Sequence, residues 1–515
     1  MPKHKSKGDS SSSKKRQRPL LRFDHRYICA PMVGASELPF RLLCRRYGTQ
    51  LAYTPMMSAK GFVEHGDGFQ THQYDRPLVC HFWANTPQDF AAAARKAEPH
   101  CDAIDLNLGC PQRTAYLGHF GSYLMDEPDL IEEIVRAAAR AVSIPICCKI
   151  RLLPTLDETV ALCERLKNAG ASLIAIHARY RASWERTGPG ARDGPAMLDQ
   201  VQKIRERVPG VVFVANGNTI TFEDVEKNLE LTKAEGLMSA EGLLDNPALF
   251  YRRWKDDERV KVALFDPEAE SKRHKYAKKL RKIAKLEERV AQEKKLDADQ
   301  QHRLDSKDTV LKSYQKLLVQ KEVDLSSEPP SSLQMAREYL ELATAFPTSM
   351  RTIVFHIRRM LKDELTRYQL MKDCLACTSV HQIETAILDT IEQYQKNPDA
   401  FVFDQAKAQA EKDALERKRQ EEGKRKAYEQ RMQRKAKREG KPLDHYLRQG
   451  ADPPTDELVE KLRRASKEEA LAVWKAKHSQ HCLAFHLSEC PRGRACAFLH
   501  MDRANNIHDG DNVAG

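Results

Sequence analysis

Two features of secreted and membrane-bound proteins are missing from this sequence. No apolar run approaches the ~20 residues that a membrane-spanning helix needs, and no apolar stretch follows the basic residues near the start. We therefore expect no secretory signal, no membrane partner, and a location in the cytoplasm, the nucleus or both. In such a reducing compartment the 13 cysteines are expected to be thiols, catalytic groups or metal ligands, not a disulfide framework.

Two cofactor signatures are absent from the N-terminal half. No G-x-G-x-x-G turn follows the first predicted strand, which weakens the case for an open, doubly wound sheet. The ends of the predicted strands carry no cluster of His and carboxylate residues with ligand spacing, so there is little sign of a metal in this half.

The composition indicates several domains and an anionic partner. A length of 515 residues suggests roughly three domains. Apolar residues make up 41%, enough for a real core, while 31% charged residues indicate solvated helices or tails as well. The formal net charge of +12 favours a polyanionic partner.

Short apolar segments alternate with helical patterns between Tyr27 and about Phe250. Strand–helix units repeated in this way predict a closed (β/α)8 TIM barrel of the α/β class, within residues 23–255, and an open sheet is the alternative. The eight predicted strands are Ile28–Ala30, Leu51–Tyr53, Leu78–His81, Ala103–Leu106, Ile146–Lys149, Leu173–His177, Val212–Ala215 and Gly236–Ser239.

The stretch Asp105–Gln112 presents a cysteine at the end of a predicted buried strand. The strand breaks at Gly109, and Pro111 stiffens the turn behind Cys110. In a parallel barrel this end carries the chemistry, and a thiol there can act as nucleophile or proton donor. Taken alone, Cys110 could equally be a buried structural cysteine.

The other strand ends favour a functional site, because their polar or Gly-rich groups gather on the same face of the barrel. Gly-rich turns after the seventh and eighth strands would let backbone N–H groups approach a phosphate. Lys149 could place positive charge beside the N1 edge of a reduced flavin. The pattern therefore suits a flavin.

Five motifs resemble those of one enzyme family. They are Ala30–Met32, Asp105–Pro111, Cys148–Arg151, Ala215–Asn218 and Met238–Gly242. In this order and at this spacing they resemble the tRNA-dihydrouridine synthases, and most closely the eukaryotic branch that reduces D-loop uridines 16 and 17. The resemblance covers about residues 27 to 252.

The resemblance implies FMN at the barrel mouth, NADPH as the electron source and tRNA as the substrate. Reduced FMN would deliver hydride to C6 of uridine, and Cys110 would donate the proton at C5; a thiol with a pKa near ~8.5 is protonated at neutral pH. Asn107 and Arg151 would face the substrate. The implied FMN contacts are Pro31, Met32, Val33, His81 (where the family usually has Gln), Lys149, His177, Asn216, Gly217, Asn218, Ala240 and Glu241.

Basic and helical regions flank and follow the barrel. Spaced apolar residues predict a charged helical hairpin inserted at 256–328. A helical domain at 329–398 resembles the family's small domain that embraces tRNA. Residues 399–475 are predicted to be a basic helical or disordered linker, residues 1–22 a disordered basic tail, and residues 504–515 a short tail.

The last motif is Cys482-x7-Cys490-x5-Cys496-x3-His500, within residues 476–503. Three thiolates and one imidazole at this spacing predict a closed tetrahedral Zn²⁺ site. The pattern resembles CCCH zinc fingers, which often bind single-stranded RNA.

The sequence thus favours an FMN- and NADPH-dependent reductase of uridine in tRNA, expected to be a monomer. A flavin oxidoreductase acting on a free pyrimidine is one alternative, and the basic tail, basic linker and predicted zinc finger argue against it. A non-catalytic RNA-binding adaptor is the other, and the intact Cys110 and Lys149 argue against that.

Overall fold

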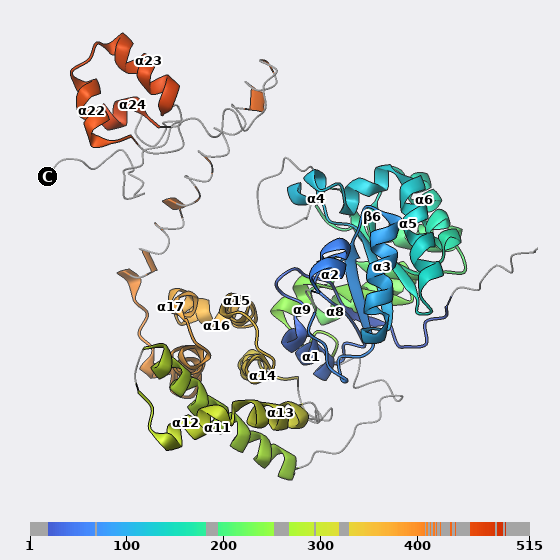
Figure 1. The fold of residues 1–515 in the computed structure, drawn as a ribbon, viewed down its shortest axis with the longest axis horizontal. Helices are drawn as coiled ribbons and strands as arrows, with labels where there is room; N and C mark the ends of the chain where they lie inside the picture. Colours follow the sequence, from blue (N-terminus) through green and yellow to red (C-terminus); the bar gives the residue numbers. More distant parts are fainter. Residues whose placement is uncertain are drawn as a thin grey trace, which may run out of the picture. The chain divides into compact units, whose positions relative to one another are not determined.

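The computed structural model describes residues 19–66, 69–181, 194–251, 267–292, 295–318, 329–406, scattered positions between 408 and 438, and residues 454–478, 481–487 and 490. The chain divides into two compact units, Met1–Val402 and Phe403–Gly515. The first holds a strand-and-helix barrel and a set of helices, and the second holds short helices near the C-terminus (Figure 1).

The centre of the first unit is a closed ring of eight parallel strands. Strand β2 pairs with both β1 and β4, and this second pairing closes the sheet into a barrel. The (β/α)8 prediction is therefore confirmed, and the open-sheet alternative is wrong. The ring consists of β1 (Tyr27–Cys29), β2 (Leu51–Tyr53), β4 (Leu78–Trp83), β5 (Ala103–Leu108), β6 (Ile146–Leu152), β7 (Ala171–Tyr180), β8 (Val212–Asn216) and β9 (Gly236–Ser239). A ninth, two-residue strand, β3 (Met57–Ser58), pairs only with the end of β4.

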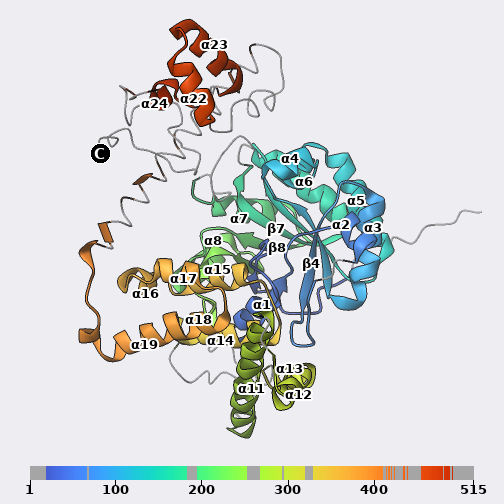
Figure 2. The ribbon, with the colours of Figure 1, turned by 60° about the vertical axis from the view of Figure 1, so that its left-hand side comes forward.

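Helices surround the ring (Figure 2). Several begin where a Thr side chain accepts a backbone N–H, as at the capping boxes of Thr155 and Thr221. The helices are α1 (Leu38–Arg46), α2 (Ala59–His65), α3 (Pro87–Ala97), α4 (Arg113–Leu117), α5 (Pro128–Ala141), α6 (Leu156–Ala169), α7 (Leu198–Arg207), α8 (Phe222–Thr232) and α9 (Glu241–Asp245).

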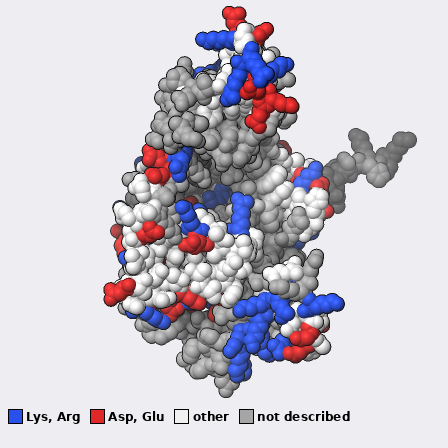
Figure 3. All heavy atoms as spheres, turned by 90° about the vertical axis from the view of Figure 1, so that its left-hand side faces the viewer, with Lys and Arg blue, Asp and Glu red and all other residues white. Residues whose placement is uncertain are grey.

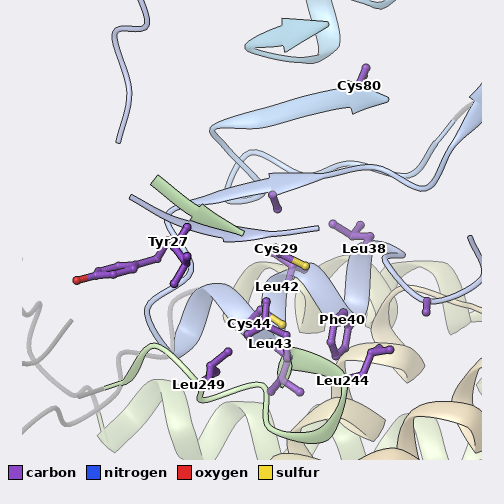
Figure 4. Packing of buried hydrophobic residues seen from close by; sticks show 14 of the residues in the cluster. Tyr27, Cys29, Leu38, Phe40, Leu42, Leu43, Cys44, Cys80, Leu244 and Leu249 are labelled. Carbon is purple, nitrogen blue, oxygen red and sulfur yellow. The ribbon is translucent and has the colours of Figure 1, made fainter. Parts of the chain in front are cut away.

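The strands separate two hydrophobic cores, because successive side chains of a strand point to opposite faces. Strand residues such as Ile28, Val79 and Leu173 form one cluster inside the ring. The alternate strand residues join the helices in a larger outer core. Figure 4 shows part of that outer core, where Leu42 and Cys44 of α1 lie beside Cys29 of β1.

The predicted site residues share the inward-facing positions of the strands. In β6, Cys147 belongs to the inner cluster and Cys148 to the outer core, so Lys149 and Arg151 also face inward. The pairing of β6 with β7 is regular from Cys147 to Arg151, and register shifts occur only at the two ends of this stretch. Strand geometry therefore brings the polar residues to one end of the barrel interior.

A group of helices follows the barrel in the first unit. Helices α11 and α13 pack together, with Leu280, Val310 and Tyr314 buried and an ion pair between Lys307 and Glu287. Helix α14 docks on the barrel, since the Tyr339 hydroxyl donates to Oε1 of Glu37 over 2.7 Å and Arg46 pairs with Glu338 at 3.1 Å. The helices are α11 (Pro267–Ala291), α12 (Ala298–Asp305), α13 (Lys307–Leu318), α14 (Ser332–Ala345), α15 (Met350–Met360), α16 (Lys362–Arg367), α17 (Met371–Ala376), α18 (Val380–Gln382) and α19 (Asp389–Lys396).

The second unit contains α22 (Asp456–Arg463), α23 (Lys467–Lys477) and α24 (Leu483–Leu487). The first two helices lie in the range predicted as a basic linker, yet Leu462, Ala470 and Trp474 form a small core there. The Trp474 indole N–H donates to the carbonyl of His481 over 2.8 Å, which ties α23 to the start of the predicted finger. Among the described helices of the chain, none is long and apolar enough to cross a membrane.

Candidate active site

The loop after β5 holds Cys110 in a fixed position at the barrel mouth. The Asn107 side-chain oxygen accepts the backbone N–H groups of Gly109 (2.8 Å) and Cys110 (3.0 Å). The Cys110 carbonyl accepts both the N–H and the hydroxyl of Ser122, each at 3.0 Å. Gly121 is required beneath this loop, because its φ is +68° and a Cβ there would lie 2.8 Å from the Cys110 carbonyl oxygen.

Cys110 differs from the other barrel cysteines in its exposure. Among the described cysteines of the barrel it is the one that is not buried, so the reading of Cys110 as a buried structural cysteine does not hold. Partial burial raises the pKa of the Cys110 thiol, and the Gln112 backbone, Arg151 and Lys149 oppose that rise. The thiol is therefore protonated at neutral pH and can hold a proton for transfer.

Arg151 braces the same loop from β6. Its Nε donates to the carbonyl of Gly109 over 2.7 Å, and Nη1 donates to the carbonyl of Tyr180 over 2.9 Å. Burial, together with the nearby Arg179, lowers the Arg151 pKa to about 10, which leaves it charged at neutral pH. Asn107 thus contacts the Cys110 loop, and Arg151 contacts both that loop and Tyr180; the contact of either residue with substrate stays a prediction.

Lys149 lies on the neighbouring inward position of β6. Its ammonium group donates to Oδ1 of Asn216 over 3.1 Å, and the Asn216 amide in turn donates to the carbonyl of Met238 over 2.9 Å. Burial, and secondarily Arg151, lowers the Lys149 pKa to about 8. The ammonium group thus remains largely charged at pH 7 and faces the predicted cofactor turn.

The turn after β8 is shaped by tight backbone packing. Gly217 has φ +128°, and a Cβ there would lie 2.7 Å from the Cβ of Ala196. Asn218 has φ +49° and its carbonyl accepts the Asn228 amide over 3.0 Å. This turn also touches the segment after β9, since the Ser239 hydroxyl donates to the Thr219 carbonyl over 2.7 Å.

Arg179 connects this turn to His177 and was not among the predicted site residues. Its guanidinium donates to Nε2 of His177 (2.8 Å), to Oδ1 of Asn218 (2.6 Å) and to the carbonyl of Gly194 (2.9 Å). Because arginine has no acceptor, Nε2 of His177 accepts this hydrogen bond. The sequence signal for Arg179 was its position two residues after His177, which gives both the same strand face.

His81 lies deeper in the barrel than the residues above. Its side chain is 2% exposed, and Nδ1 lies 2.6 Å from Oδ2 of Asp105 on the paired strand. Burial raises the Asp105 pKa, and the bond to His81 opposes that rise. The predicted flavin contact of His81 stays a prediction.

The loop after β1 carries Pro31, Met32 and Val33. The Ser36 hydroxyl accepts the Met32 N–H at 3.0 Å and donates to the Met32 carbonyl at 3.1 Å, which fixes the loop at its start. Val33 is 72% exposed. Strand β1 pairs with β9, so this loop and the Ala240–Glu241 segment leave the barrel side by side.

The residues at the mouth fit an FMN. The small side chain of Ala30 belongs to the apolar cluster inside the ring, and that of Ala240 packs against it. Lys149 offers a cation to the flavin's N1 edge, and the Gly217 turn allows close backbone approach to a phosphate. This donor set is what a phosphorylated, electron-accepting ring requires.

The predicted zinc ligands are only partly within the described residues. Cys482 and Cys490 are both buried and belong to one small cluster with Ala484 and Phe485. Cys496 and His500 lie outside the described residues. In the parts of the chain that the structure describes, no group of three or more His, Cys, Asp or Glu residues could hold a metal. The zinc site stays a prediction.

Part of this chain is similar to named proteins of mouse and yeast. A protein of Mus musculus named tRNA-dihydrouridine(16/17) synthase NAD(P)(+)-like is 44% identical over 234 residues, which are 44% of this chain and 48% of that protein. The tRNA-dihydrouridine(16/17) synthase of Saccharomyces cerevisiae is 40% identical over 231 residues, 43% of this chain and 53% of the yeast protein. The chain thus spans about half the length of these relatives.

One solved structure and one family profile also match parts of this chain. The structure, a 2-naphthoyl-CoA reductase complex, aligns with 45% of this chain and 50% of that chain at 9% identity, and its TM-score of 0.35 is too low to carry an argument. The profile described as "Dihydrouridine synthase (Dus)" matches residues 28–340, more than half of the sequence. The chain therefore belongs to the dihydrouridine synthase family.

Proposed function

We propose that this protein is a tRNA-dihydrouridine synthase that reduces the C5–C6 double bond of D-loop uridines, with FMN as cofactor and NADPH as electron donor. One observation carries the proposal. A protonated, partly exposed thiol stands on a fixed loop at the mouth, near the positive charges of Arg151 and Lys149. The names of the mouse and yeast relatives support positions 16 and 17 as the target.

FMN, when bound, supplies the hydride that reduces C6 of the uracil ring. Cys110 holds a proton on Sγ and releases it to C5, and its raised pKa keeps that proton in place until the enolate forms. Asn107 and Arg151 keep the thiol in position by holding the Gly109 and Cys110 backbone. Lys149 holds positive charge beside the site where the reduced ring carries negative charge.

Substrate binding requires the uridine to leave its stack in folded tRNA, at a cost of a few kcal/mol. Phosphate contacts to basic surfaces can offset that cost. Exposed lysines recur along α11, among them Lys275, Lys278, Lys282 and Lys285. Figure 3 shows a dense group of Lys and Arg side chains at the height of α11 to α13. We assign tRNA binding to these helices and to the helical domain at 329–398.

The C-terminal region would add a CCCH zinc finger that contacts RNA. Support comes from the spacing of Cys482, Cys490, Cys496 and His500, and from the common burial of the first two.

Cys490→Ser should release one equivalent of zinc and weaken tRNA binding, with the barrel flavin retained. Cys377→Ser, at a cysteine in the helical domain, is the matched control. Tight tRNA binding by a zinc-free variant would show that the predicted finger does not contribute to tRNA binding.

The deciding experiment uses the purified full chain with FMN, NADPH and unmodified tRNA transcripts, and detects dihydrouridine by mass spectrometry. We expect a bound flavin spectrum and NADPH oxidation that depends on tRNA. Transcripts carrying cytidine in place of the uridines at positions 16 and 17 should give no product. Equal reduction of free uridine would support the free-pyrimidine alternative instead, and a chain that binds tRNA but no flavin would be the adaptor.

A further inference from the structure

Helix α15 of the helical domain contacts two neighbouring segments of the barrel mouth. On one side, Nε2 of His356 lies 2.9 Å from Oε1 of Glu37, which follows the β1 loop. On the other, Arg359 reaches α9, which follows β9. Strands β1 and β9 are paired, so both contacts are made at one sector of the ring, the sector that carries the predicted FMN residues Met32 and Glu241. Figure 2 shows α15 on the barrel side of the helical group.

The Arg359 guanidinium binds two carboxylates of α9 at once. Its Nε donates to Oδ1 of Asp245 over 2.6 Å, and Nη2 donates to Oε2 of Glu241 over 2.8 Å and to the Glu241 carbonyl over 3.3 Å. The two carboxylates stand four residues apart, on the same face of the helix. A planar fork suits such a bridge, whereas a single ammonium group would reach one partner at a time.

Helix α9 depends on outside contacts for its position. It has five residues, Glu241–Asp245, which is too short to be stable as an isolated helix. Its first turn packs closely on the β8 turn, because a Cβ at Gly242 would lie 2.5 Å from the Thr219 carbonyl oxygen. A shift of α9 would therefore disturb Thr219, the residue that directly follows the predicted phosphate turn.

Arg359 also lowers the net negative charge around α9. Its guanidinium places positive charge against the carboxylates of Glu241 and Asp245, on the segment that is predicted to meet the phosphate of FMN. Like charges at such distances repel, and the effect is felt within about 10 Å at ordinary salt. The guanidinium thus both fixes α9 and lowers the repulsion that a phosphate would meet.

We propose that Arg359 is a positioning residue of the flavin site, so that the docked helical domain forms part of the cofactor-binding structure as well as part of the tRNA-binding surface. This inference rests on the proposed function, since it takes FMN to be the cofactor. It predicts that damage to one ion pair between the domains weakens FMN binding, although Arg359 itself belongs to neither the catalytic loop nor the phosphate turn.

The test measures FMN affinity of the apo full chain by quenching of flavin fluorescence. Arg359→Ala should raise the Kd by about tenfold, the size of effect seen when residues outside a site modulate coupling. Arg359→Lys should recover part of the affinity. The charge swap Arg359→Asp with Asp245→Arg should recover affinity relative to Arg359→Asp alone, which a general loss of folding would not allow.

Two variants serve as matched controls. Arg337 also pairs with two carboxylates, Asp389 and Glu392, but both lie within the helical domain. Arg46 pairs with Glu338 across the same domain boundary, at the end of α1. Arg337→Ala and Arg46→Ala should leave the FMN Kd within about twofold of the parent, since neither ion pair includes a residue of α9 or of the turn after β8.

The outcomes separate this inference from the proposed function. If Arg359→Ala binds FMN as the two controls do, or if Arg46→Ala weakens FMN binding equally, the positioning role of Arg359 is wrong and the proposed function stands. If the unaltered chain binds no FMN, the proposed function itself fails. Retained FMN affinity with lost tRNA affinity would assign Arg359 to the RNA surface alone.

Discussion

The floor and the mouth of the barrel are built from the same strands, and they differ in what those strands present. At the floor, Ile28, Val79 and Leu173 fill the ring with apolar side chains. At the mouth, the next inward positions hold Lys149 and His177, whose hydrogen bonds run to the polar side chains of Asn216 in β8 and Arg179 in β7. The floor therefore closes the barrel, and the mouth holds charges that the floor could not solvate. A substitution at the mouth should change function before stability, and one at the floor should do the reverse.

The largest expected effect is at the mouth. Cys110→Ala should lower dihydrouridine formation by roughly 10²- to 10⁴-fold, the usual contribution of a general acid. FMN and tRNA affinities should stay near those of the parent, because the loop is held through its backbone. Quantitative mass spectrometry of tRNA gives the rate. Cys147→Ala, at an inward but buried position of β6, is the control and should keep full activity per folded molecule.

The next effect is at the floor. Leu173→Ala, at a fully buried position inside the ring, should destabilise the barrel by about 2–5 kcal/mol through lost contacts and a cavity. The urea midpoint of barrel unfolding measures this loss. The FMN Kd of the folded fraction should not change. A Leu173→Ala protein that keeps the parent's urea midpoint but no longer binds FMN would contradict the distinction between the floor and the mouth.

Arg179→Met should weaken FMN binding by roughly tenfold or more, since it removes the hydrogen bonds that hold His177, Asn218 and the Gly194 carbonyl together. Arg181→Met is the matched control. Arg181 is close in sequence, but it pairs with Asp126 and lies over the Tyr123 ring, away from the turn after β8. Equal FMN affinities in the two variants would contradict the role of Arg179.

The smallest effect is a pH dependence of stability from Lys149. Its pKa is about 8 in the folded protein and 10.5 as an ordinary lysine, so between these values the unfolded chain binds more protons. Stability of the apoprotein from this group should therefore rise as pH increases from about 8 to about 10.5. Lys149→Met should lack this slope when unfolding midpoints are compared across the window. A parallel slope in both proteins would show that other groups cause it.

The barrel could be predicted because each strand is a local apolar run with its polar residue at the end. Strand β3 was missed, since its two residues are extended only through pairing with Phe82 and Trp83 of β4. The helical hairpin predicted at 256–328 contains a further helix, α12, between α11 and α13. Asp297 caps a helix with Gln300, so α12 begins at Ala298. That capping signal was present in the sequence.

Only the site residues that stand in short sequence motifs were predicted. Cys110 and the Asn216–Asn218 turn stand in short contiguous stretches that can be recognised one by one. The bond from Arg179 to Asn218 joins residues 39 positions apart, and the bonds from Arg359 to α9 span more than 110. Such contacts depend on the closure of the ring and on domain docking, which residue spacing along one chain does not encode.

The regular pairing of β6 with β7 has a consequence for how this protein could change. Between the two register shifts, the side chains of Cys147, Lys149 and Arg151 face the barrel interior, and those of Cys148 and Ile150 pack in the outer core with the helices. Deleting Cys147 would shift the register of the rest of β6 by one residue, turn Lys149 and Arg151 toward the helices and bring Cys148 and Ile150 into the lumen. Single-residue deletions in this window would thus remove the chemistry and the outer packing together, whereas point substitutions can alter either one alone.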